Sequence, residues 1–147
     1  MRELIELQTG QVAFISGLMS GFSLSVAAHV LRYGIRSRVA QAVFLMLLLS
    51  SLLFLLALYV DVRLGIELAG VETIGEEAAR RIAEVRVIGT TGATVALFMF
   101  VVAIGLLGWL ATPMTGLLGS LLAGGVLFAL WFVWTSIGDI TALLGTA

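Results

Sequence analysis

The sequence predicts an all-α membrane protein with four transmembrane helices. Of its 147 residues, 61% are hydrophobic and only 12% are charged, which is typical of membrane proteins. With histidine neutral, three long segments carry no charge: 7–31, 39–60 and 87–138. A helix needs about 20 apolar residues to cross about 30 Å of hydrocarbon. Because Pro113 divides the longest segment near its middle, the three segments provide four spans.

We expect residues 1–147 to form a single transmembrane domain. Its spans are predicted near residues 11–33, 39–60, 86–111 and 115–137. Gly34 suits the end of the first helix, and residues 112–116 form a tight, uncharged helical hairpin.

The connection over residues 61–85 is different, because it holds six acids and three arginines. Thr73 and Glu76 have the spacing of a capping box, and Glu76 with Arg80 and Glu77 with Arg81 are i,i+4 ion pairs in the favourable order. We therefore expect part of this polar loop to be helical, with one long helix from about residue 76 to 111 that projects beyond the membrane.

Composition excludes several classes of protein. The chain has no cysteine and a single histidine, His29, so thiolate chemistry and multi-histidine metal or haem sites are excluded within one chain. No span contains a pair of carboxylates. We expect no enzymatic activity, no catalytic residues, no metal site and no cofactor, and the net charge of −1 suggests no nucleic-acid partner.

Arginines set the expected orientation. The side that holds the N-terminus carries five of them and the opposite side carries three, at 32, 36 and 38. The excess favours a cytoplasmic N-terminus, in an integral protein of the cell (inner) membrane.

Small residues form stripes that favour close helix packing. Gly17 and Gly21 form a GxxxG pair in the first span. Similar stripes occur in the third and fourth spans, at Gly89, Gly92 and Ala96, and at Gly116, Ser120 and Gly124, with Gly119 and Ala123 beside the latter. Packing within one subunit explains most of them, and their number also allows packing between subunits.

The first span has an unusual face. At helical spacing, Gln11, Leu18, Ser25 and Arg32 fall on one side of the helix, flanked by Phe22 and His29. Gly17 and Ser20 lie on the opposite, packing side. A purely lipid-facing stripe would be apolar throughout, and four helices leave little interior for water, so a water-filled path between subunits is a plausible place for this face.

His29 is the sharpest candidate for function, because an ionisable residue within a span is a functional hypothesis and histidine changes charge near neutral pH. The ordinary structural alternative is that His29, about one turn from the helix end, reaches interfacial water or caps the last carbonyls.

Asp61 and Asp139 are interpreted as interfacial acids, with Arg63 near Asp61. Side chains of the second span that can bond to carbonyls of their own helix need no function: Gln41, Ser50 and Ser51.

The stretch SGFSLSVAAHVL, residues 20–31, resembles the first transmembrane helix of the Orai calcium-channel family. There a Ser-Gly-Phe precedes the selectivity-filter glutamate, which lies seven residues after the Phe; here that position is His29. The layout is also similar, with a long third helix that ends in Trp109 and a hairpin to a fourth. The family's acid on the third helix corresponds to Ala103.

The resemblance implies six subunits around a pore lined by their first helices, in a homo-oligomer that passes inorganic ions across the lipid bilayer. The implied pore-lining residues are Phe14, Leu18, Gly21 or Phe22, Ser25 and His29, where His29 is the filter or pH-sensing position; Gln11 is added from helical spacing, with Arg32 at the pore mouth.

The function expected from these observations is the pore-forming subunit of an oligomeric, cation-conducting channel. One alternative is a small four-helix exporter of the kind that needs a membrane-embedded carboxylate for proton coupling, although none of the predicted spans contains one. The other is a non-conducting subunit of a larger membrane complex.

Overall fold

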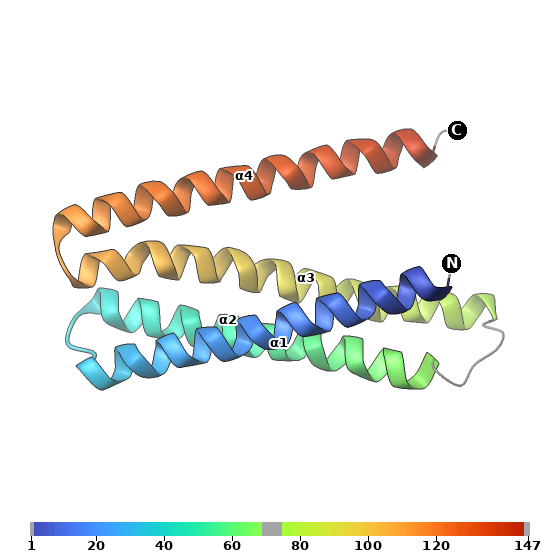
Figure 1. Ribbon diagram of the computed structural model, residues 1–147, viewed down its shortest axis with the longest axis horizontal. Coiled ribbons are helices and arrows are strands. Elements are labelled where there is room, and N and C mark those ends of the chain that lie inside the picture. Colours follow the sequence, from blue (N-terminus) through green and yellow to red (C-terminus); the bar gives the residue numbers. More distant parts are fainter. Residues whose placement is uncertain (1, 69–74, 146–147) are drawn as a thin grey trace.

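Four long helices run alternately up and down in the structure, a computed structural model that describes residues 2–68 and 75–145 (Figure 1). The helices are α1 (Arg2–Tyr33), α2 (Arg38–Leu68), α3 (Glu76–Leu107) and α4 (Pro113–Gly145), with a 3-10 turn, η1 (Gly108–Leu110), between the last two. Each helix is long and apolar enough to cross a membrane. The prediction of an all-α protein with four spans is therefore confirmed, and both ends of the chain lie at the same end of the bundle.

Local sequence explains where the helices turn. Gly34 has a φ of +88°, a left-handed conformation that suits glycine, and its N–H donates to the carbonyl of Leu31 (3.1 Å) at the end of α1. Ser37 then accepts a hydrogen bond from the N–H of Ala40 (3.0 Å) and caps α2. In the α3–α4 hairpin, Thr112 accepts from the N–H of Thr115 (3.2 Å), which starts α4. The predicted short connections are thus confirmed.

Helix α2 is longer than its predicted span. It continues through residues 61–68, which were expected to begin the polar loop. Neither charge nor Gly65 interrupts it, and Arg63 pairs with Glu67 one turn on (2.8 Å), a favourable i,i+4 contact.

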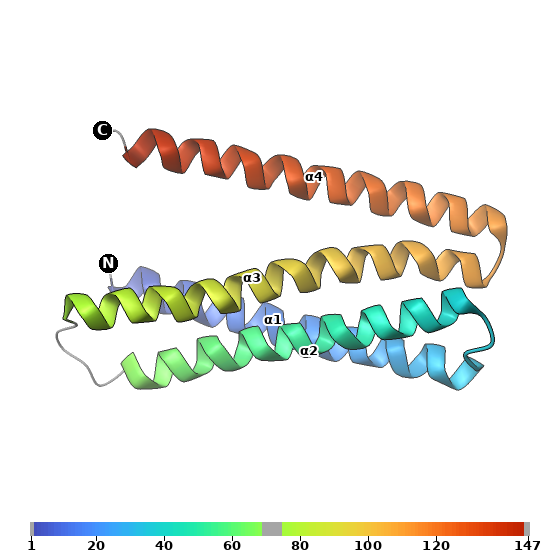
Figure 2. The same ribbon diagram turned by 180° about the vertical axis from the view of Figure 1, so that it is seen from behind.

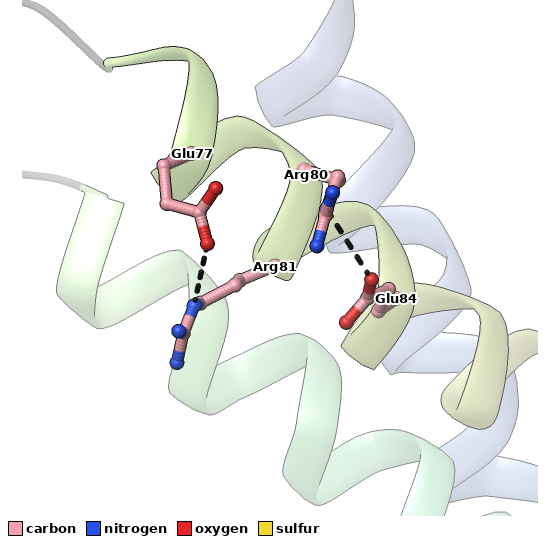
Figure 3. Close-up of polar contacts among 4 residues, drawn as sticks. All are labelled: Glu77, Arg80, Arg81 and Glu84. Carbon is pink, nitrogen blue, oxygen red and sulfur yellow. Dashed lines mark hydrogen bonds and ion pairs between the residues drawn. The ribbon is translucent and has the colours of Figure 1, made fainter.

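Helix α3 begins where the sequence predicts, but with a different cap. Gly75 precedes its first turn and makes no side-chain capping bond, while Thr73 of the expected capping box lies outside the described residues. Figure 3 shows the exposed ion pairs in the first turns of α3. Arg81 contacts Glu77 (3.3 Å), as predicted. Arg80 contacts Glu84 (3.7 Å), a pair that was not predicted from the sequence.

Helix α2 is the centre of the bundle, and α1 and α3 both pack against it. The core cluster combines Ala27 and Val30 of α1, Val43 and Leu47 of α2, and Ala103 of α3. Ala103 is fully buried, so a larger acid would not fit at this position without displacing its neighbours.

Glycines bring α3 and α4 together at the hairpin. A Cβ on Gly105 would lie 2.6 Å from Cβ of Ala123, and one on Gly119 would lie 3.0 Å from the carbonyl oxygen of Gly105. The Trp109 ring lies across Gly116, and its N–H donates to the hydroxyl of Ser120 (2.9 Å). Beyond this region α4 diverges from the other helices (Figures 1 and 2). Large apolar side chains along α4 are exposed.

The other small-residue stripes serve packing only in part. Gly89 lies close to Val60 (3.1 Å from its added Cβ), and Ala96 is fully buried between α2 and α3. By contrast, a Cβ on Gly21 or on Gly124 would meet no atom within 4 Å. These two glycines are not explained by packing within the chain.

Candidate functional site

Three serines of α1 lie on its packed side. Ser16, Ser20 and Ser23 are buried together with Ala27 and Val30, and this side of α1 contacts α2. Small side chains at this spacing let two helix backbones approach closely. The hydroxyl groups of these serines therefore belong to the helix interface and not to a water-facing surface.

Ser20 and Ser51 bond reciprocally across the α1–α2 interface. The Ser20 hydroxyl donates to the carbonyl oxygen of Ser51 and the Ser51 hydroxyl donates to the carbonyl oxygen of Ser20, each at 3.1 Å, and the two hydroxyl oxygens are also 3.1 Å apart. On the other side of α2, the Ser50 hydroxyl donates to the carbonyl oxygen of Ala96 in α3 (2.8 Å). Ser50 and Ser51, which could have bonded to carbonyls of their own helix, bond instead to carbonyls of neighbouring helices, because α1 and α3 approach α2 closely.

Directly opposite the packed side, α1 presents a continuous exposed stripe. Phe14, Leu18, Gly21, Ser25 and Arg32 follow one another at intervals of three, four or seven residues, and all are exposed in the single chain. Phe14 is 71% exposed and Leu18 is 61% exposed. The stripe combines aromatic, aliphatic, hydroxyl and guanidinium groups on the side of α1 that faces away from α2.

The remaining predicted residues lie on a flank of this stripe. Gln11 is exposed there near the start of the span. Phe22 is 54% exposed and makes an edge-to-face contact with Phe100 of α3, with ring centroids 5.9 Å apart. His29 is exposed and lines a cavity beside the α3–α4 hairpin. Of the two alternatives, Gly21 and Phe22, a Cβ on Gly21 would meet no atom within 4 Å, whereas Phe22 contacts Phe100 of α3.

The burial of Asp61 was not predicted from the sequence. Asp61 is only 9% exposed, and its carboxylate interacts electrostatically with Arg86 of α3. Asp61 was interpreted as an interfacial acid with Arg63 near it; its side chain is buried within the bundle, whereas Arg63 is exposed and pairs with Glu67 (2.8 Å). Helical spacing could have revealed this, since Asp61 continues the buried line of Ser50, Phe54 and Ala57. Asp139, the other acid interpreted as interfacial, lies in α4, and its side chain is outside the described residues.

Among the residues described, no three His, Cys, Asp or Glu side chains are grouped so that they could hold a metal ion. The candidate site is instead a surface of α1. It is a mixed polar and apolar stripe that runs the length of a membrane helix, with positive charge at one end.

The fold and this surface define an integral membrane protein of four transmembrane helices. Comparisons with known protein families, with curated proteins and with solved structures find no match to the chain.

Proposed function

We propose that the chain is the pore-forming subunit of an oligomeric ion channel, in which α1 helices of several copies surround the ion path. The observation that carries this proposal is the exposed stripe of α1, which has Ser25 and Arg32 on the side away from α2, with Gln11 exposed on its flank. Polar and ionisable side chains in membrane spans generally face protein or water and not lipid. A second copy of α1 across a hydrated path provides such surroundings.

The apolar members of the stripe suit the same role. Phe14 and Leu18 lie one turn apart, and in a ring of subunits each would form an apolar constriction that gates by dewetting. Gly21 has no side chain, so in such a ring it would leave the path wider one turn further along. His29 and Arg32 follow at the mouth.

Similarity of residues 20–31 to the first helix of Orai channels favours six copies and cation conduction. A ring of Arg32 side chains at one mouth favours anions. Charge selectivity is therefore measured directly, from the reversal potential across a planar bilayer with a KCl gradient. A reversal potential towards the K⁺ equilibrium value supports the cation channel, and one towards the Cl⁻ value identifies an anion channel built on the same stripe.

The test of pore formation itself uses purified protein in liposomes. We expect ion flux above that of protein-free liposomes, together with a closed ring of subunits by native mass spectrometry. A dimer without electrical conductance would contradict the proposal.

One observation favours the exporter as a second candidate. Asp61 is a buried acid of α2, the kind of group that proton-coupled transport uses, and it interacts electrostatically with Arg86 of α3. Asp61→Asn distinguishes the two functions, since an exporter loses transport driven by a pH gradient, whereas a channel lined by α1 retains its conductance.

A further inference from the structure

A cavity of about 410 Å³ opens at the end of the bundle where α1 meets α2 and α3 meets α4. Val30, Leu107 and Leu110 form an apolar wall, while His29, Arg36 and Ser37 supply polar groups. One side of the cavity is thus suited to hydrocarbon and the other to an anion.

The cavity lies at the level of the membrane boundary. The candidate span of α1 ends at Arg32 and that of α2 begins at Arg38, so Arg36 sits in the connection between two membrane-crossing segments. The α3–α4 hairpin closes the other side with Leu110 and Ala111. A molecule in this cavity is therefore in contact with both the headgroup region and the hydrocarbon of the bilayer.

Charge at this end of the protein is one-sided. Arg32, Arg36 and Arg38 lie within seven residues, and no acid occurs between residues 7 and 60 or between 85 and 138. Eight of the nine acids lie in the described helices, in segments towards the opposite end: near the start of α1, the end of α2, the start of α3 and the end of α4. Neutralisation of the three guanidinium groups therefore has to come from outside the chain.

We infer that this cavity binds an anionic phospholipid, with the lipid phosphate at Arg36 and an acyl chain along Leu107 and Leu110. Arginine is well suited to phosphate because its guanidinium donates parallel hydrogen bonds, and basic pockets between transmembrane helices are suited to lipid headgroups. A free phosphate ion would use only the polar side of the cavity. The inference is independent of the proposed pore, because it requires no conduction and no particular number of subunits.

Native mass spectrometry of the full chain in detergent tests this site. Dioleoyl-phosphatidylglycerol is the probe, and the zwitterionic dioleoyl-phosphatidylcholine is its control. We expect bound phosphatidylglycerol at concentrations where phosphatidylcholine is lost. Arg36→Gln should weaken binding about fivefold, the order expected for one basic residue near an anionic lipid surface. Arg63→Gln removes the same charge at the opposite end and should leave binding unchanged.

A second variant tests the apolar wall without changing charge. Ala111→Trp fills the cavity from the hairpin and should also weaken binding, whereas Leu117→Trp on exposed α4 should not. Melting temperatures confirm that each variant is folded. Equal retention of both lipids, equal effects of Arg36→Gln and Arg63→Gln, or full displacement of the lipid by an equal concentration of inorganic phosphate would each overturn the inference.

Discussion

Ser20 of α1 and Ser51 of α2 exchange hydroxyl-to-carbonyl hydrogen bonds across the helix interface, each 3.1 Å long. This relationship fixes which side of α1 is turned inwards. With Ser20 facing α2, helical spacing places Leu18, Gly21 and Ser25 on the outside. The proposed pore face therefore depends on a polar contact in the buried interface.

The serine contact predicts opposite effects for two neighbouring substitutions. Ser20→Ala should lower the free energy of unfolding by about 0.5–1.5 kcal/mol, because it removes a buried hydrogen bond. Ser23→Ala should leave stability unchanged or raise it, because the Ser23 hydroxyl is buried without a hydrogen-bond partner among the described residues. Thermal melting in detergent measures both, and equal destabilisation would contradict this account of the interface.

The α3–α4 contact predicts a second contrast, between two glycines. Gly105→Ala should cost about 1–3 kcal/mol, the usual range for overpacking, because the new methyl group would lie 2.6 Å from Cβ of Ala123. Gly124→Ala is the matched control, since it meets no atom within 4 Å. If both variants melt at the wild-type temperature, the close approach of α3 and α4 is wrong.

The apolar part of the stripe predicts a gate. Leu18→Ser should increase ion leak from liposomes, because a polar ring at this level holds water where a leucine ring excludes it. The variant's oligomeric state is measured in parallel. Wild-type flux through a correctly assembled Leu18→Ser protein would exclude a gate at this residue.

His29 predicts a pH response. A proton on each imidazole adds positive charge to a ring that already lies near Arg32 and Arg36, so cation current should fall on acidification. His29→Ala should abolish this response, and His29→Glu should increase preference for divalent cations, which favour carboxylate oxygens. An unchanged pH response in His29→Ala would assign His29 to the ordinary role of an interfacial side chain.

Span length and charge were sufficient to predict the four helices, because crossing a bilayer requires long apolar segments. The tight hairpin at Thr112 and the turn at Gly34 could also be predicted, since both depend on local chemistry. The partners of Ser50 and Ser51 could not, because a serine in a helix bonds equally well to its own carbonyls or to those of a neighbour. Only the approach of α1 and α3 to α2 decides between them.

The candidate site, too, could be predicted from the sequence only in part. Helical spacing grouped Leu18, Ser25 and Arg32 correctly on one exposed face. It did not separate Phe22, whose contact with Phe100 depends on where α3 lies, and it did not reveal the electrostatic interaction of Asp61 with Arg86. Contacts between helices far apart in the sequence determine both.

The central claim is that the exposed face of α1 lines a water-filled path, and paired cysteine substitutions test it most directly. Leu18 and Leu55 are both exposed leucines, at 61% and 46%. They share one depth, because Ser20 meets Ser51 and Gly17 meets Leu58 on either side of them. The chain has no native cysteine, so the background is clean.

The measurement is the current through Leu18→Cys and Leu55→Cys channels before and after a charged, membrane-impermeant methanethiosulfonate reagent. We expect irreversible block of the Leu18→Cys current and an unchanged Leu55→Cys current, because only the α1 position faces water. If the reagent leaves both currents unchanged, or blocks both equally, α1 does not line the pore.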